Sequence, residues 1–258
     1  MADGADFQID PRDLIAGLGR GLAIIEAFNG SERLTPTEAA GRTGIPRTAA
    51  RRYLESLCHF KYAQTDGKYY WLAPRILRIG QSYLGTARLP RLVKPFIQRL
   101  SMSTGESVNV CVLDEHEVLY IARSASPRMV PIGYQAGDRV PAHAVTPGYV
   151  LLSGLDRAAL SQWTAAHDFT GHSGSTPVDG DQLIEAVQAA QALGYWVVSG
   201  LLDPGLGGVA VPLVDHRGAT VAALSMTLQV SRWPQDRIID TLVPALRETA
   251  QLLNAALG

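Results

Sequence analysis

The chain has 258 residues, of which 47% are hydrophobic and 18% charged, and its formal net charge is −1. This length accommodates one or two domains, and we favour two, while the composition excludes a chain that is disordered throughout. So small a net charge excludes a uniform positive field over the whole molecule. Any nucleic-acid site therefore has to be a local basic patch.

Neither the cysteines nor the histidines form a recognisable catalytic or metal-binding motif. Cys58 and Cys111 lie far apart within apolar patterns, so we expect two buried thiols in a reducing compartment rather than a disulfide. His167 and His172 are only loosely paired, and the sequence has no CxxC or HExxH motif, so we expect no metal and no cofactor. The acidic start of the chain is unlike a signal peptide, and no apolar run of about 18 residues is present to span a membrane. We therefore expect a soluble, cytoplasmic protein.

Residues 14–44 have the pattern of two helices, and the second is short because Gly41 and Gly44 bracket its end. Apolar residues recur at three- and four-residue steps until Asn29-Gly30 ends the first helix. These apolar residues are Leu14, Leu18, Leu22, Ile25 and Phe28. The run Thr35-Pro36-Thr37-Glu38 has the capping-box pattern that begins a second helix, with Thr35 as its N-cap.

A third helix and a β-hairpin follow. Ile45-Pro46 opens the helix, which runs to about Cys58. Its apolar face consists of Ala50, Tyr53, Leu54 and Leu57. At about 100° per residue, Thr48 and Arg52 point away from this face, and Arg47 and Arg51 flank it. Residues 62–64 and 69–72, joined by the turn Asp66-Gly67-Lys68, have the pattern of a hairpin.

The order of these elements predicts a winged helix-turn-helix over residues 1–73. The order is helix, helix, turn, arginine-bearing helix and hairpin. A basic helix alone is usually a solvated face, but the order of the five elements favours a DNA-binding domain. No acidic residue lies between Arg42 and Arg52, so this patch is positive although the chain is not. We expect contacts with double-stranded operator DNA from Thr35, Thr37, Arg47, Thr48, Arg51, Arg52 and Lys68.

The remaining sequence predicts a linker helix over residues 74–89 and an α+β domain with a mostly antiparallel sheet over residues 90–258. Strands are expected at 108–113, 118–122, 129–134, 195–199, 208–214 and 220–229. Helices are expected around 91–101 and at 156–167, 181–193 and 234–257.

Three stretches resemble the IclR family of bacterial transcription regulators: residues 13–28, 137–144 and 203–212. The first is similar to the opening helix of the subfamily that controls the β-ketoadipate pathway and responds to 4-hydroxybenzoate or protocatechuate. The resemblance implies a winged helix followed by an effector-binding domain with a GAF-like fold. It also implies a homo-oligomer, either a dimer or a dimer of dimers.

The resemblance further implies an effector pocket for a small aromatic carboxylate. A glycine turn and two hydroxyls on one strand face suit a carboxylate without a metal. Met129, Ile132 and Leu206 are expected to cover the ring, and Arg128 and His143 lie in the same region. The expected effector contacts are Arg128, Met129, Ile132, His143, Thr146, Pro147, Gly148, Leu206, Ser225 and Thr227.

The sequence departs from the family pattern at positions that are usually basic or polar. These positions hold Tyr149, Ser199-Gly200 and Gly207-Gly208. The pocket is therefore less charged and more aromatic than in typical members, which favours an aromatic acid. The alternative is a regulator that senses a short aliphatic carboxylate.

An enzyme is the competing class of function. The nearest approach to a nucleophile elbow is 171–175, Gly-His-Ser-Gly-Ser, which lacks the G-x-S-x-G pattern and its strand-to-helix setting. The glycine-rich runs at 17–19 and 205–208 do not lie between a strand and a helix. We therefore expect no catalytic residues, and a small-molecule hydrolase remains only as an alternative. A constitutive architectural DNA-binding protein would leave the second domain unexplained.

Overall fold

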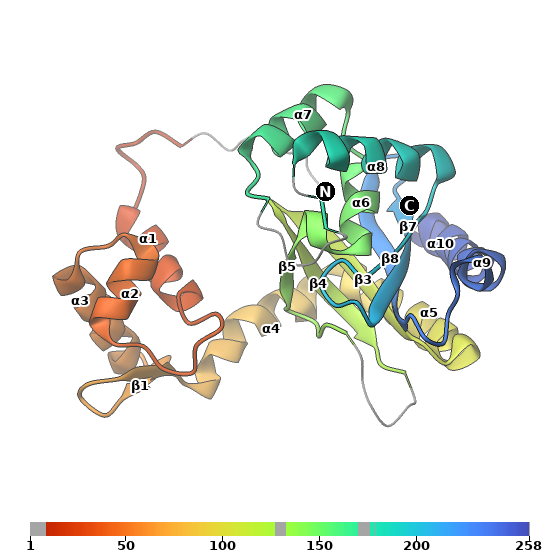
Figure 1. The fold of residues 1–258 in the computed structure, drawn as a ribbon. Coiled ribbons are helices and arrows are strands. Elements are labelled where there is room, and N and C mark those ends of the chain that lie inside the picture. Colours follow the sequence, from red (N-terminus) through yellow and green to blue (C-terminus); the bar gives the residue numbers. More distant parts are fainter. Residues whose placement is uncertain (1–8, 127–132, 170–175, 178, 258) are drawn as a thin grey trace. The chain divides into compact units, whose positions relative to one another are not determined.

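The structure is a computed structural model, and it describes residues 9–126, 133–169, 176–177 and 179–257 (Figure 1). The chain divides into two compact units, Met1–Gly85 and Thr86–Gly258. In the described part of the chain, no helix has the length and apolar character needed to cross a membrane.

The first unit contains a helix-turn-helix followed by a hairpin. Its elements are α1 (Ala16–Glu26), α2 (Pro36–Thr43), α3 (Arg47–His59), β1 (Ala63–Thr65), β2 (Tyr70–Leu72), a 3-10 turn (Pro74–Ile76) and α4 (Leu77–Thr86). The capping box is confirmed, because Thr35 Oγ1 accepts from Glu38 N while the Glu38 carboxylate accepts from Thr35 N. The two short strands pair antiparallel around the predicted turn.

The apolar face predicted for the first helix is correct at Phe28 and wrong at Leu14, Leu18 and Leu22. Ile24 and Phe28 are buried, whereas Leu14, Leu18 and Leu22 are 56%, 64% and 46% exposed. The core of this unit is small and uses one turn of α1 to contact α2 and α3. Because α1 carries more apolar residues than that core accepts, a second stripe stays on its surface.

The second unit is built on one six-stranded antiparallel sheet in the order β5-β4-β3-β8-β7-β6. Its strands are β3 (Ser107–Asp114), β4 (Glu117–Ser124), β5 (Arg139–Pro141), β6 (Trp196–Ser199), β7 (Leu206–Val214) and β8 (Thr220–Gln229). Its helices are α5 (Arg88–Thr104), a 3-10 turn (Ala142–Ala144), α6 (Thr146–Leu152), α7 (Arg157–Ala166), α8 (Gly180–Leu193), α9 (Gln235–Arg237), a π-helical segment (Ile238–Leu242) and α10 (Val243–Leu257). The predicted α+β class with an antiparallel sheet is confirmed.

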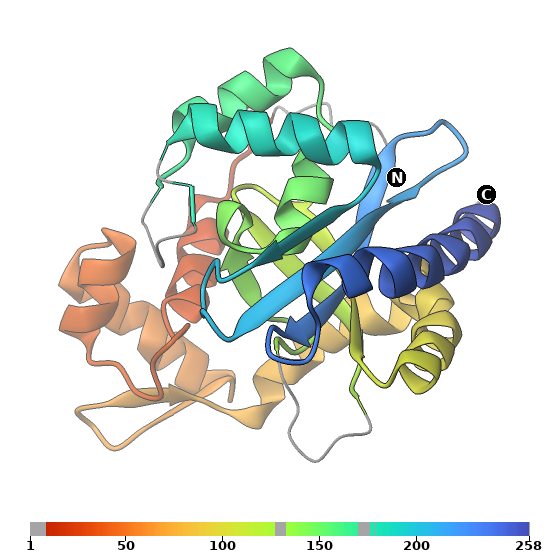
Figure 2. The same ribbon diagram turned by 45° about the vertical axis from the view of Figure 1, so that its right-hand side comes forward.

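Helices cover both faces of this sheet (Figure 2). Val93 and Ile97 of α5 and Leu246 and Leu253 of α10 pack on one face. The helices α6, α7 and α8 cover the other face, where Tyr149 lies within the core. The site described below lies on this second face, at the start of α6.

Three local predictions differ from the structure. Thr146–Leu152 forms a helix rather than a glycine turn, because Pro147 at its first turn favours helix initiation. The helix predicted at 234–257 contains the π-helical segment Ile238–Leu242. In the strand predicted at 129–134, residues 129–132 lie outside the described residues, and Gly133 and Tyr134 are not in a strand.

Candidate functional site

Helix α3 presents a basic surface. Ala50 and Leu54 pack into the core, while Arg47, Thr48 and Arg52 are exposed. Within the described residues, Arg47 and Arg52 have no ion-pair partner, whereas Arg51 Nε donates to Glu55 Oε1 at 2.8 Å. The positive charge of α3 is therefore concentrated at its two unpaired arginines.

The hydroxyl and basic side chains of α2 and its cap have different surroundings. Thr37 is exposed on α2, but the Thr35 hydroxyl is engaged in the cap, where it also donates to Glu38 Oε2 at 2.8 Å. Arg42 belongs to the fold rather than to the exposed basic surface. Its guanidinium donates to Ala27 O at 2.7 Å and to Ser31 Oγ at 2.6 Å.

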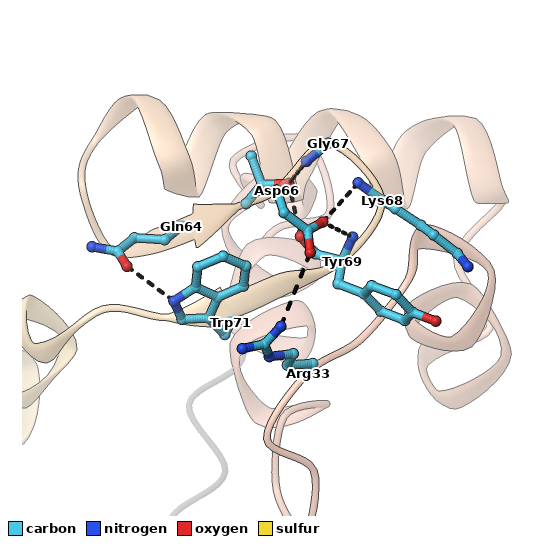
Figure 3. Close-up of polar contacts among 8 residues, drawn as sticks. Arg33, Gln64, Asp66, Gly67, Lys68, Tyr69 and Trp71 are labelled. Atoms are coloured by element: carbon cyan, nitrogen blue, oxygen red, sulfur yellow. Dashed lines mark hydrogen bonds and ion pairs between the residues drawn. The ribbon is translucent and has the colours of Figure 1, made fainter.

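The hairpin holds Lys68 at its tip through side-chain bonds (Figure 3). Asp66 Oδ1 accepts from the backbone N–H groups of Lys68 and Tyr69, at 3.0 and 2.8 Å, and these bonds lower the pKa of Asp66. Trp71 Nε1 donates to Gln64 Oε1 at 2.9 Å across the two strands. The turn is thus preorganised, with the Lys68 ammonium near the Tyr69 ring.

A cavity of about 70 Å³ lies between the sheet and the start of α6. A volume of this size accommodates several water-sized groups. Among the predicted effector contacts, those that line the cavity are Thr146, Pro147, Leu206, Ser225 and Thr227. The structure therefore brings together residues that lie up to 81 positions apart, from 146 to 227.

Two predicted effector contacts have other surroundings. Gly148 packs against the backbone, because a Cβ added there would lie 1.9 Å from Ala142 O. His143 is buried beside His167, whose Nε2 lies 2.6 Å from His143 Nδ1. The structure does not bring His143 to the cavity. Arg128, Met129 and Ile132 lie outside the described residues.

Arg139, which lies near these predicted contacts in sequence, forms ion pairs. Its guanidinium contacts Asp114 and Glu117, both at 2.6 Å. These two pairs tie β5 to the β3–β4 turn, so Arg139 supports the sheet edge rather than the cavity.

Several cavity residues were not anticipated from the sequence. The rings of Tyr120 and Tyr134 are in contact in a tilted arrangement, with centroids 4.8 Å apart, and both line the cavity. Gly208 lets the sheet approach Thr146, since a Cβ there would lie 2.4 Å from Thr146 Oγ1. The adjacent glycines Gly207-Gly208 could have revealed this contact from the sequence, because a glycine within a strand marks a close approach of another part of the chain. Asp203 is the only charged side chain among the described residues that line the cavity.

The wall formed by Ser225 and Thr227 is polar but uncharged. Asn109 Nδ2 donates to Thr227 Oγ1 at 3.4 Å, and Ser225 Oγ lies 3.9 Å from Cys111 Sγ. Burial raises the pKa of the Cys111 thiol well above its usual value, so the thiol stays protonated. Hydroxyl groups in such surroundings can donate hydrogen bonds to an anion without a neighbouring cation.

A cluster of three histidines lies beside α7. His167 Nδ1 is 3.2 Å from His116 Nδ1, and the His167 ring stacks on Trp163 with centroids 4.4 Å apart. Burial, followed by the charges of His143 and His116, lowers the pKa of His167 to about 4, although Asp168 opposes the shift. Among the described residues, no group of three or more potential ligands has metal-binding geometry. The cluster packs His167 against His116, His143 and the Trp163 ring.

Two family models match the chain. The model "Bacterial transcriptional regulator IclR C-terminal" matches residues 81–255, and "IclR helix-turn-helix domain" matches residues 17–67. The chain belongs to the IclR family. The region that matches the IclR helix-turn-helix includes the basic helix α3, and the region that matches the C-terminal model includes the residues that line the cavity.

Two bacterial regulators are similar to this protein over nearly the whole chain. The p-hydroxybenzoate hydroxylase transcriptional activator of Acinetobacter baylyi is 40% identical, over 95% of this chain and 93% of its own. The Pca regulon regulatory protein of Pseudomonas putida is 35% identical, over 93% and 83%. The family and these relatives are transcription regulators, so this IclR-family protein is a regulator and not an enzyme.

Solved structures of related regulators have the same fold. The inducer-binding domain of the Acinetobacter PobR transcription factor, a double mutant in complex with 3-hydroxybenzoic acid, is 34% identical with a TM-score of 0.61, over 65% of this chain and 98% of that one. An IclR homologue from Microbacterium hydrocarbonoxydans, complexed with 4-hydroxybenzoate, has a TM-score of 0.74 at 22% identity, over 93% and 98%.

Proposed function

We propose that this IclR-family regulator senses a monocyclic aromatic acid, 4-hydroxybenzoate or protocatechuate, in the cavity at the start of α6. The observation that carries the proposal is the composition of the cavity wall. Hydroxyls of Thr146, Ser225 and Thr227 are present to bind a carboxylate, and the rings of Tyr120 and Tyr134 offer aromatic surface to a benzene ring. The names and ligands of the relatives support this class of compound.

The carboxylate is held by hydroxyls and, we propose, also by Arg128. Asp203, which lines the cavity, supplies an acceptor, and its charge suits a ring hydroxyl rather than a second carboxylate. Burial, then Asp138 and Asp203, raises the pKa of Tyr134, so its phenol remains protonated and can donate a hydrogen bond. Met129, Ile132 and Leu206 cover the ring in this proposal.

Calorimetry on a double variant tests the carboxylate site. Each hydrogen bond to a charged group contributes about 1.5–3 kcal/mol, so Ser225→Ala with Thr227→Val should weaken 4-hydroxybenzoate binding by about 100-fold or more. Thr220→Val, on the same strand but away from the cavity, is the matched control and should bind normally. Wild-type affinity in the double variant would rule out this site. Binding of a short aliphatic acid without binding of any benzoate would establish the alternative effector class.

The regulator binds operator DNA, in this proposal, through the exposed side chains of α3 and the hairpin tip. Arg47, Thr48, Arg51 and Arg52 face the major groove, and Thr37 and Lys68 contact flanking phosphates. Thr35 contributes through the cap that positions Thr37. The DNA-binding domain spans residues 1–73, the linker helix 74–89 and the effector domain 90–258, and the protein acts in the cytoplasm.

We also propose that the regulator is a homo-oligomer, a dimer or a dimer of dimers. One helix-turn-helix makes few base contacts, whereas a two-fold pair reads two half-sites. The exposed apolar residues on the first unit fit this role, namely Leu18 and Leu22 on α1 and Leu77, Ile79 and Tyr83 on α4. Oligomerisation would remove this apolar surface from water.

A further inference from the structure

Asn109 lies beside the hydroxyl wall of the cavity, on the neighbouring strand β3. It is in the middle of β3, 1% exposed, and in the β3–β8 register it is paired with Ser225. Side chains of directly paired residues on neighbouring strands are in contact range, and diagonal neighbours are only slightly farther away. The diagonal neighbour Thr227 accepts a hydrogen bond from Asn109 Nδ2. Asn109 is therefore adjacent to both hydroxyls of the wall.

The amide of Asn109 is only half used. Its Nδ2 donates to Thr227 Oγ1, but its Oδ1 is one of the buried side-chain atoms in the described residues without a hydrogen-bond partner. An asparagine oxygen is a strong acceptor, and burial without a partner costs stability. This unpaired oxygen lies next to a cavity. We therefore attribute the presence of an asparagine here to ligand binding rather than to packing of the core.

The unpaired oxygen has a consequence for the two hydroxyls. A hydroxyl has one proton, and Oδ1 takes neither that of Ser225 nor that of Thr227. Thr227 Oγ1 is an acceptor for Asn109, so its own proton points elsewhere. The neighbour of Ser225 Oγ is a thiol, which is a weak partner at 3.9 Å. The Thr227 proton therefore remains available to a ligand in the cavity, and only the weak contact with the sulfur competes for the Ser225 proton.

We propose that Asn109 is a positioning residue that sets the charge preference of the effector site, selecting a carboxylate by keeping both hydroxyls as donors. This inference rests on the proposed function. A neutral amide directs the Thr227 proton into the cavity and adds no charge. A carboxylate at the same position would accept both hydroxyl protons and repel an anionic ligand. An apolar side chain would leave the Thr227 hydroxyl free to rotate.

The substitution Asn109→Asp separates these effects, because it conserves shape and changes only hydrogen bonding and charge. We expect calorimetry to give an affinity for 4-hydroxybenzoate reduced by about 100-fold, since two charge-assisted bonds are affected. The affinity for 4-hydroxybenzamide, which has no carboxylate, should change by less than about threefold. Burial raises the pKa of a carboxyl group, so the loss for 4-hydroxybenzoate should deepen as the pH rises from 5.5 to 8.

Two controls keep the test decisive. Asn254→Asp applies the same chemistry on α10, where Oδ1 accepts from Val214 N, and it should leave both affinities unchanged. Asn109→Leu should weaken 4-hydroxybenzoate binding in the wild-type background but not in the Thr227→Val background, because the effect passes through Thr227. This comparison of Asn109→Leu in the two backgrounds also tests the role of Asn109 if the Asn109→Asp protein does not fold.

If Asn109→Asp weakens the binding of 4-hydroxybenzoate and of 4-hydroxybenzamide equally, Asn109 only supports the fold, and the inference is overturned. Additive effects of Asn109→Leu and Thr227→Val would overturn it as well. A wild-type protein that binds no hydroxybenzoate would instead contradict the proposed function, and the inference with it. A loss of affinity for 4-hydroxybenzoate but not for 4-hydroxybenzamide, which becomes larger as the pH rises, supports both the inference and the proposed function.

Discussion

The arginines of α3 differ in how far their charge is available to DNA. Arg51 shares its charge with Glu55, whereas Arg47 and Arg52 have no such partner in the described residues. Arg52→Ala should therefore weaken operator binding by about 1–3 kcal/mol if the side chain reads a guanine edge. Fluorescence anisotropy with operator and scrambled duplexes measures both affinity and specificity.

Arg217→Ala, in the turn between β7 and β8, is the matched control for loss of one positive charge. It should leave operator affinity unchanged. An equal loss on operator and scrambled DNA for Arg52→Ala would make Arg52 a phosphate contact rather than a base contact. Unchanged affinity in a folded Arg52→Ala protein would contradict the assignment of α3 as the recognition helix.

His167 makes the stability of the effector domain sensitive to acid. Its pKa is lowered from 6.5 to about 4 in the folded protein, so between these values the unfolded chain binds a proton that the folded chain does not. Stability is therefore lost as the pH falls from 6.5 towards 4, by about 1–3 kcal/mol. Urea unfolding at pH 7 and pH 5 should show this loss in the wild type. His167→Gln should show a smaller difference, and an unchanged difference would exclude His167 as the cause.

At the scale of single elements, the cap of α2 positions the helix-turn-helix. Thr35→Ala removes the acceptor for Glu38 N and should destabilise the helix by about 1 kcal/mol. Hydrogen exchange of α2 amides in the full chain should accelerate accordingly. Thr37→Ala, two residues on and exposed, provides the control and should leave exchange unchanged. Equal protection in both variants would show that the cap does not stabilise α2.

Elements with local signals could be predicted from the sequence. The capping box at Thr35, the N-cap Asp156 and the left-handed Gly194 each mark a helix end through residues close in sequence. Helix α6 has Pro147 as its only local signal of this kind, because all seven of its residues are buried and no polar face alternates with an apolar one. The register of β3 and β8 is a property of the assembled sheet. For that reason the pairing of Asn109 with Ser225 was not predictable.

The candidate site was predictable only in part, for a related reason. Resemblance placed Thr146, Ser225 and Thr227, which the structure brings to one cavity. Tyr120 reaches it through the pairing of β4 with its neighbours, and Tyr134 through its ring contact with Tyr120. His143 has the residue type of a ligand contact, but the three-histidine cluster engages it. A residue's type and position in the chain therefore leave open whether it lines a cavity or packs against neighbours.

At the scale of the whole molecule, the exposed apolar side chains of the first unit predict an assembly. Ile79 and Tyr83 are 49% and 50% exposed and lie one turn apart on α4, so they share a helix face. Ile79→Glu with Tyr83→Glu should shift the regulator to monomer at micromolar concentration, because like charges would be buried in the interface. Operator affinity should fall by about 100-fold or more, since each half-site is then bound alone, while 4-hydroxybenzoate affinity is retained because its site lies in the other unit.

Sedimentation and calorimetry measure the two effects, with Gln81→Glu on another face of α4 as the control. A wild-type protein that sediments as a monomer with and without DNA would contradict the assembly, and a double variant that remains oligomeric would place the interface on other surfaces.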